Sequence, residues 1–556
     1  MKKVILALLL FQTAALVLAQ TTVDGEAEMM GGAFDQQPWA SALKLNFQNQ
    51  KFSVSPYVRL SAYDEKQSEE TRNVGYRYSR TGNRYELTDV NSEDGYLFNY
   101  GIASRFLLGE SNELKFNLTA THRTTEYYSH RTERLRSFEE GFDGSFAKSN
   151  VYCPTMKRDD IDAVLDFRHK FLAPGSSMGV RYQFHLNMSD DEMMQNVGES
   201  ENFHPFMSNH LLRQTQIQSH DVVVDWLTPL TQHQALDLGI RYNNSTRESD
   251  DSQVLDGKNV LNEDFRHESQ LWSVIADYRV KTSAFVGNAK LSYEHTEFHH
   301  RKLDDFVPQV RGQWNISKNN SLSLLYAMRI IRPDVEVLSP AKIIGAYTLD
   351  FGNENLKGTH ANRIVLAYTH KTEALTSTTS VTSIFANDGI TAIWMEKDNV
   401  RVSTFGNEGI RRAWSLTSDL SWKASATTTI KANGEVMWDK RIAEAINMAK
   451  EHWGAQVSLS LTQKLPARFS INVEGFYSEG YTIDLYSHYS RKVRGAAQLI
   501  RTFLRNDCLE ARLAYSYCEY PTVILTQGQY TGRVTNRIDK ENLASLSLCY
   551  RFGKSK

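Results

Sequence analysis

The alternation of short turns and long connections along the sequence constrains the fold of this chain more than any other feature. Between consecutive tight turns, the chain makes a long polar excursion, as in residues 188–210 and 243–265. Short turns at one end of the strands and long loops at the other are typical of a transmembrane β-barrel, whereas a sandwich turns every 8–12 residues without two lengths. The ten tight polar turns are Gln48–Lys51, Gly109–Asn112, Ala173–Ser176, Thr231–Gln234, Lys281–Ala284, Ser317–Asn320, Lys371–Ala374, Lys423–Ala426, Lys464–Ala467 and Leu504–Asp507.

The segments that flank these turns alternate between apolar and polar residues. In Ala544–Phe552 every second residue is apolar, and the run ends with Tyr550 and Phe552. A period of two predicts a strand with one apolar and one polar face. Within hydrocarbon every backbone N–H and C=O must be paired, so such a sheet has to close on itself. We therefore interpret Ala544–Phe552 as the closing strand of a barrel, with its two aromatic residues at the periplasmic interface.

The number of strands is the open point of this fold prediction. Ten tight turns imply twenty flanking strands and the final strand makes twenty-one, although single-chain bacterial barrels usually have an even number. Residues 20–36 lack sustained alternation, but they could supply a short first strand. The alternative is that Ala40–Phe47 pairs in parallel with the final strand. The sequence predicts an all-β fold, a large antiparallel transmembrane β-barrel of about 21–22 strands over residues 37–556.

The N-terminus and the composition agree with export. Lys2 and Lys3, an apolar run and the small-residue site Val17–Ala19 predict a secretory signal over residues 1–19. No later run of about 18 apolar residues follows. The formal net charge of −2 becomes −4 without the two lysines, which is too mild to indicate a nucleic-acid partner. Four cysteines are too few for a disulfide scaffold.

Two segments near the middle of the chain carry a resemblance to a known family. Residues 326–340 and 349–370 resemble TonB-dependent receptor barrels, in particular their outer membrane protein beta-barrel relatives, over roughly residues 37–556. The chain departs from the family pattern at Glu354 and at Gly358-Thr359, where the family usually has prolines. The residues that carry the resemblance are Tyr326, Arg329, Arg332, Pro333, Gly352, Asn353 and Leu356.

The resemblance implies a location and a set of partners. We expect a 22-strand barrel in the cell outer membrane of a Gram-negative bacterium, in contact with outer-membrane lipid and lipopolysaccharide and inserted by the barrel-assembly machinery. Family members carry a large N-terminal plug domain, for which residues 20–36 leave no room. A separate plug or a surface lipoprotein is therefore a candidate partner. The expected function is passage of a solute or ligand, and the alternative is a surface structural or interaction protein anchored by its barrel.

Arginines at the alternate strand positions that carry polar residues are the candidate lumenal residues. One interpretation is that they pair with inward acids such as Asp166, Asp237, Asp277 and Glu510. The other is that they create a field favouring anionic solutes. The arginines are Arg59, Arg168, Arg181, Arg241, Arg279, Arg311, Arg512 and Arg551.

Motifs with catalytic or metal-binding character are weak here. Gly175–Gly179 matches the G-x-S-x-G pattern but falls in a predicted turn between strands rather than on a strand–helix elbow, so we expect neither an enzyme nor a cofactor. His295, Glu297 and His299 share one strand parity and are weak candidates for a metal site. Cys508 and Cys549 point to the same face near the ends of the last two strands, where either a disulfide or two free thiols is compatible with the sequence.

Overall fold

The computed structural model describes most of the chain. Its described residues are 22–34, 39–64, 70–77, 84–136, 146–198, 205–298, 301–333, 335–338, 343–344, 348–397, 400–482, 484–485, 487–504, 507–519, 523–527, 530–536 and 540–553. The predicted secretory signal lies outside these residues. Within them, no helix has the length and apolar character needed to cross a bilayer.

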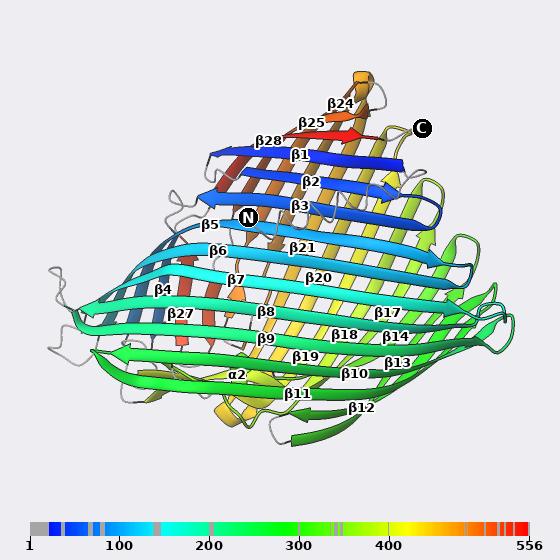
Figure 1. The fold of residues 1–556 in the computed structure, drawn as a ribbon. Coiled ribbons are helices and arrows are strands. Elements are labelled where there is room, and N and C mark those ends of the chain that lie inside the picture. The colour runs from blue at the N-terminus through cyan, green and yellow to red at the C-terminus, as the bar shows by residue number, and fades with distance from the viewer. Residues whose placement is uncertain are drawn as a thin grey trace.

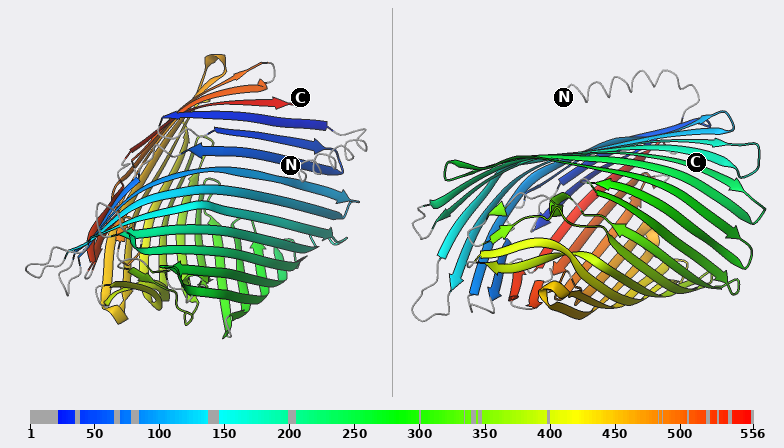
Figure 2. Two further views of the ribbon diagram at one scale, coloured as in Figure 1. Left: turned by 60° about the vertical axis from the view of Figure 1, so that its left-hand side comes forward. Right: turned by 90° about the horizontal axis from the view of Figure 1, so that it is seen from below.

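Twenty-two strands pair with their neighbours in one closed antiparallel ring, as the sequence predicts. The first half contains β1 (Thr22–Phe34), β2 (Trp39–Gln48), β3 (Phe52–Asp64), β5 (Arg84–Leu108), β6 (Asn112–Arg136), β7 (Phe146–Lys170), β8 (Ser177–Gly198), β9 (Pro205–Pro229), β10 (Gln234–Leu255), β11 (Lys258–Lys281) and β12 (Phe285–Phe298). The second half contains β13 (Arg301–Asn315), β14 (Asn320–Ile331), β17 (Thr359–Lys371), β18 (Leu375–Lys397), β19 (Val400–Lys423), β20 (Thr428–Ala443), β21 (Met448–Leu465), β22 (Phe469–Glu479), β24 (Lys492–Phe503), β25 (Leu509–Glu519) and β28 (Lys540–Phe552). Figure 2 shows this tilted wall from two further sides.

Shorter elements lie at the end of the barrel opposite the tight turns. β23, β26, β27 and β4 pair in that order, so external connections from three places in the chain form a continuous ladder. β16 pairs in parallel with the first residues of β19. These elements are β4 (Glu70–Arg77), α2 (Val335–Leu338), β15 (Ile343–Ile344), β16 (Thr348–Asp350), the 3-10 helix Glu444–Ile446, β23 (Ser487–Tyr489), β26 (Val523–Gln527) and β27 (Tyr530–Asn536). A second 3-10 helix, Pro466–Arg468, belongs to the tight turn between β21 and β22.

All ten predicted tight turns connect neighbouring strands of the wall. In the first of them, the backbone N–H of Asn49 donates to the carbonyl of Phe52 at 2.9 Å. The side-chain oxygen of Asn49 accepts from the N–H of Lys51 at 2.7 Å. Such side-chain to backbone bonds explain why polar residues mark these turns in the sequence.

The presence of β1 raises the number of strands in the wall from the twenty-one counted in the sequence to twenty-two. β1 pairs antiparallel with β2 and also with β28, where Gly25 lies opposite Phe552 (Figure 1). The expectation of a short first strand within residues 20–36 is therefore confirmed, and the alternative of a parallel pairing between Ala40–Phe47 and the final strand is wrong. The adjacent pairs Met29-Met30 and Gly31-Gly32 hide the alternation of β1, but the ladder needs only backbone donors and acceptors.

The long polar excursions are more regular than the sequence suggests. Residues 243–265 belong almost entirely to the β10–β11 hairpin, and residues 188–210 mostly extend β8 and β9. The connections at this end of the barrel are long, as predicted, and most of their described residues are in strands. Asp256 and Gly257 turn the β10–β11 hairpin with φ of 50° and 75°, which is the geometry that an Asp-Gly pair favours in two-residue hairpin turns.

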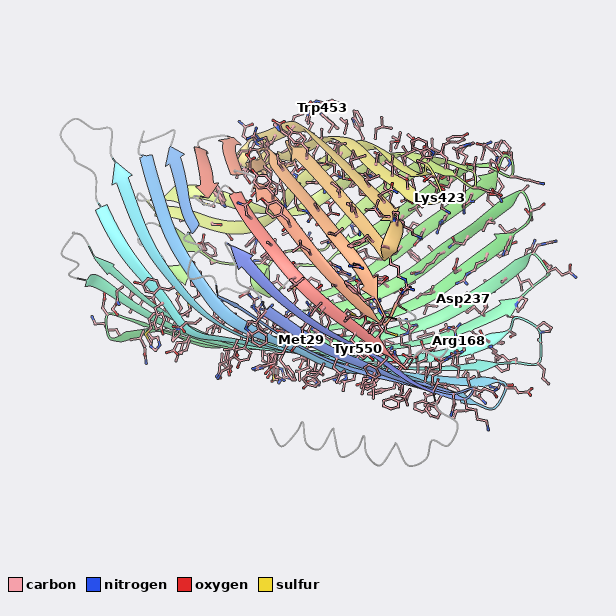
Figure 3. The ribbon with its side chains drawn as sticks, turned by 90° about the horizontal axis from the view of Figure 1, so that it is seen from above. Met29, Arg168, Asp237, Lys423, Trp453 and Tyr550 are labelled. Atoms are coloured by element: carbon pink, nitrogen blue, oxygen red, sulfur yellow. The ribbon has the colours of Figure 1, made fainter. Side chains whose placement is uncertain are left out.

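The outer face of the wall carries an apolar belt bordered by aromatic side chains. Met29, Trp453 and Tyr550 are exposed on this face, as Figure 3 shows. Leu546 and Leu548 of the closing strand are exposed on it too. An outward apolar band with aromatic girdles is what a barrel presents to lipid, so residues of the opposite parity line the lumen.

Candidate functional site

Most of the candidate lumenal arginines are paired with carboxylates. The guanidinium of Arg59 and that of Arg311 are exposed, and neither has an ion pair within the described part of the chain. The lumenal wall is consequently a mosaic of both charges rather than a single positive field. The ion pairs are Arg168–Asp225 (3.6 Å), Arg181–Asp166 (2.9 Å), Arg241–Asp221 (2.6 Å), Arg279–Asp237 (2.5 Å), Arg279–Asp277 (2.9 Å), Arg512–Glu510 (2.8 Å), Arg551–Glu510 (3.1 Å) and Arg551–Glu26 (3.2 Å).

A cavity of about 780 Å³ lies against the lumenal face of β18–β22 and β24. We call it the lumenal cavity. The amide of Asn433 donates to Asp419 at 2.6 Å, and Arg494 pairs with Glu474 at 3.1 Å. Its further lining includes the hydroxyls of Ser458 and Ser460, the cations Lys431 and Lys492, and one aromatic ring, Phe476. Its lining can therefore hydrogen-bond a polar solute from several strands at once.

A group of charged and aromatic side chains lies on the same strands, further toward the external end. Asp439 of β20 is fully buried, and its carboxylate accepts from Arg411 at 3.0 Å and from Arg441 at 3.2 Å. Asp439 pairs with His452 of β21 across the sheet, and Arg441 pairs with Lys450. We call Asp439, Arg441, Lys450, His452 and His488 the external cluster.

The described residues of 480–489, which we call segment 480–489, lie over the wall and complete this cluster. The ring of His488 lies 4.1 Å from that of His452, measured between centroids. Between the external cluster and the lumenal cavity, Glu435 accepts a hydrogen bond from Tyr481 at 3.1 Å and another from Gln456 at 2.7 Å. The segment thus covers the wall immediately external to the cavity. This cluster is not among the sites predicted from the sequence, and only the shared parity of Lys450 and His452 could have indicated it.

The family-motif residues close a seam in the wall. β13 and β14 pair only from Asn315–Ser321 to Gln309–Ala327, and Pro308 follows, which has no N–H for a ladder. Arg332 spans the opening and donates to Glu294 at 2.7 Å and to Thr296, which is fully buried, at 2.8 Å. The motif residues therefore hold an external segment against the split wall.

The second half of the motif is held by backbone contacts. The amide of Asn353 donates to the carbonyl of Phe405 at 2.8 Å. Leu356 is completely buried, and its carbonyl accepts from Arg301 at 3.3 Å. Gly352 is also buried in this turn. In the first half, Tyr326 donates to Asn362 at 2.9 Å, Pro333 follows Arg332, and Arg329 is exposed.

The weak metal candidates do not form a metal site in the described residues. His295 contacts Asp304 at 2.7 Å and Glu297 at 3.3 Å, while Lys302 pairs with Glu297 at 2.6 Å. These side chains form a mixed-charge network on the outer face of the rim. His299 lies outside the described residues. No group of three or more histidine, cysteine or acidic side chains that could hold a metal ion occurs in the part of the chain that the structure covers.

None of the four cysteines, all of which the structure describes, forms a disulfide. Cys549 lies opposite Glu510, whereas the N–H of Arg551 donates to the carbonyl of Cys508 at 2.7 Å. A disulfide between Cys508 and Cys549 is therefore not formed, because the register places the two residues diagonally. Diagonal neighbours on one face are about 7–8 Å apart, which exceeds the usual span of a disulfide.

The serine of the G-x-S-x-G match, Ser177, is the first residue of β8 and is buried, and the residue before it, Ser176, makes a structural contact. Ser176 is buried in the turn between β7 and β8, and its hydroxyl donates to the carbonyl of Leu227 at 3.3 Å. Gly175 adopts a positive φ of 82° that this turn requires. The motif thus reflects turn geometry.

The closed 22-strand wall with its outward apolar belt defines an integral β-barrel of the outer membrane of a Gram-negative bacterium. The profile of the outer membrane protein beta-barrel family matches residues 169–492, and the chain belongs to this family. No curated protein matches the chain.

Solved structures of receptor barrels share the fold. The siderophore receptor PirA from Pseudomonas aeruginosa is 9% identical with a TM-score of 0.61, over 96% of this chain and 80% of that one. The ferric enterobactin receptor PfeA from the same species, in a mutant form in complex with enterobactin, is 12% identical with a TM-score of 0.63, over 96% and 81%. The iron transporter FrpB from Neisseria meningitidis is 12% identical with a TM-score of 0.56, over 97% and 82%. The chain is thus structurally similar to TonB-dependent receptor barrels.

Proposed function

We propose that this protein carries a small polar solute across the outer membrane through its lumen. The observation that supports this most is the lumenal cavity of about 780 Å³, which polar and charged side chains of six strands line. A barrel that only anchors surface loops does not require such a polar cavity on its lumenal wall. PirA and PfeA are receptors and FrpB is an iron transporter, and these roles agree with a transport role for this chain.

The arrangement along β20 and β21 supports a direction for this passage. From the external end, the lumenal residues of β21 run from Lys450 and His452 through Gln456 to Ser458 and Ser460 in the cavity. A solute captured at the external cluster would meet Glu435, held by Tyr481, before it reaches the cavity. Two devices could control passage, the external segments of this chain or a plug from a separate chain, and we propose the external segments as the first candidate.

Conductance of the purified full-length protein in planar bilayers tests the proposal. We expect discrete channels, and we expect Ser458→Trp to lower the conductance because the indole would enter the cavity. Val457→Trp is the matched control, since Val457 faces lipid on the same strand and is exposed there. Equal conductance of the wild type and both variants would contradict passage through this cavity.

A second candidate function has its own support. Strands β5, β6, β7 and β9 each contain 25 residues, whereas about 9–11 are enough to cross a bilayer. A tall external wall would also suit a surface structural or interaction protein. Protein that shows no channel and no swelling of sugar-loaded liposomes, even after the external hairpins are shortened, would favour this alternative.

A further inference from the structure

Three polar atoms in and beside the external cluster are buried without a hydrogen-bond partner. They are the ammonium nitrogen of Lys450, the hydroxyl of Thr482 and Nδ1 of His488. The residue Lys450 is only 4% exposed and His488 only 9%. Burying an ammonium without a partner costs several kcal/mol unless a counter-charge accompanies it. An anionic group placed beside this ammonium would offset that cost.

The fold brings these three residues to one place. Thr482 and His488 face each other in an isolated antiparallel bridge. The imidazole of His488 contacts that of His452 at a tilt of 33°, and His452 shares the lumenal face of β21 with Lys450 two residues away. Arg441, opposite Lys450 on β20, reaches the carbonyl of Thr482 at 3.4 Å. Segment 480–489 and strand β21 therefore form the two sides of one site.

The acids near this site are already engaged. The carboxylate of Asp439 is shared by Arg411 and Arg441. Asp484 accepts from both the N–H and the hydroxyl of Ser487, at 2.6 and 2.8 Å. Glu435 accepts from Tyr481 and Gln456. The ammonium of Lys450 thus has no carboxylate in hydrogen-bond contact among the described residues.

We propose that Lys450, Thr482 and His488 bind an oxyanion group at the external end of the lumenal cavity. An ammonium provides three donors and a hydroxyl one, and Nδ1 of an imidazole donates or accepts according to its tautomer. This set suits the oxygens of a phosphate or carboxylate, and charge-assisted bonds to them are short and strong. Binding itself stands apart from transport, whereas its role in solute capture rests on the proposed function.

Titration calorimetry of the full-length protein in detergent tests the site, with inorganic phosphate and citrate as separate probes. The two probes distinguish a free inorganic oxyanion from the carboxylates of an organic solute. We expect saturable binding of at least one probe, and we expect Lys450→Met to weaken it at least tenfold. Lys440→Met is the matched control, because Lys440 lies on the outward parity of β20 and pairs with Glu451 at 3.7 Å, and it should bind as the wild type does.

Resistance to heat unfolding on gels gives a second readout that does not depend on transport. The bound probe should raise the unfolding temperature of the wild type and of Lys440→Met, but not that of Lys450→Met. Absence of binding by both probes, or unchanged binding by Lys450→Met, would overturn the site. Wild-type channels that conduct while neither probe binds would reject the oxyanion site alone, whereas binding without any conductance would reject the proposed passage alone.

Discussion

Arg332 and Glu294 join two strands that the sheet itself does not connect. Arg332 follows the external end of β14, and Glu294 faces the lumen from β12, yet their side chains meet at 2.7 Å. β13 lies between these strands and loses its ladder to β14 beyond Gln309. The pair therefore replaces backbone pairing with a side-chain connection, and a residue of the family motif acquires a structural role.

Replacing Arg332 should open this seam. We expect Arg332→Met to destabilise the barrel by about 1.5–3 kcal/mol, because Glu294 would lose a charge-assisted hydrogen bond in a mostly buried setting. The measurement is the unfolding midpoint in denaturant, followed by the loss of heat-modifiable gel mobility. Arg329→Met provides the control, since Arg329 is exposed near the external end of the same strand, β14. Equal midpoints for the two variants would show that Arg332 does not hold the seam.

Charges placed on the two faces of β25 should have different effects. Leu513→Arg exposes a guanidinium to lipid and should cost about 2–4 kcal/mol with impaired assembly. Ser516→Arg places the same group in the lumen and should assemble nearly as the wild type. The amount of heat-modifiable protein in outer-membrane fractions measures this difference. Comparable losses for both variants would mean that the faces are assigned wrongly.

The cysteines should all react as thiols. We expect four labelled cysteines per chain after denaturation without reductant, because the register keeps Cys508 and Cys549 on a diagonal. In the native barrel, Cys549 should react slowly, since it is buried and its thiol donates to Glu26 at 2.9 Å. Intact-mass spectrometry counts the labels, and a count of two would indicate that a disulfide forms in the cell.

Docking of segment 480–489 should weaken as the pH falls. Burial lowers the pKa of His488 to about 4, with help from the neighbouring His452 and Lys450. An unfolded histidine titrates near pH 6.5, so the undocked segment binds more protons between pH 6.5 and 4. The stabilising contribution is thus fully present above pH 6.5 and is lost as the pH falls toward 4.

Burial also lowers the pKa of Lys450 to about 8. The negative charge of Asp484 acts against this shift, and the positive charge of Arg441 adds to it. The stabilising contribution of docking around Lys450 is likewise lost as the pH falls, but between about pH 10.5 and 8. Hydrogen exchange of residues 480–489, corrected for intrinsic rates, measures both windows. His488→Asn should remove the acidic window and leave the alkaline one. Unchanged protection of the wild-type segment from pH 7 to 4 would contradict this expectation.

The strands and tight turns of the barrel wall could be predicted because each depends on residues that are close together in the sequence. Polar turn residues such as Asn49 bond their own backbone, and strand residues such as Leu546 and Ser547 alternate with the faces of the sheet. The extended hairpins are not predicted, even though Asp256-Gly257 marks the turn of one of them, because a long polar run has the composition of a loop. Outside the membrane both faces of a strand meet water, so alternation no longer marks it.

The site was less predictable because it depends on distant parts of the chain. Lys450 and His488 are separated by a tight turn, a full strand of the wall and part of an external connection. Their proximity follows from how residues 480–489 fold back, and no short pattern in the sequence specifies that fold. The lumenal parity of arginines such as Arg181 could be predicted, whereas the partner of each one follows from strand register.

The pairing of Gly25 with Phe552 also bears on how the barrel closes. This ladder joins strands at opposite ends of the described chain, so the wall is closed only when this ladder and every intervening strand are in place. Until then β1 and β28 are two unsatisfied edges, each of which could recruit a strand from another chain. We therefore expect another protein to cover both edges during assembly, and the barrel-assembly machinery is the expected candidate. That protein has to dissociate from β1 and β28 before these two strands can pair.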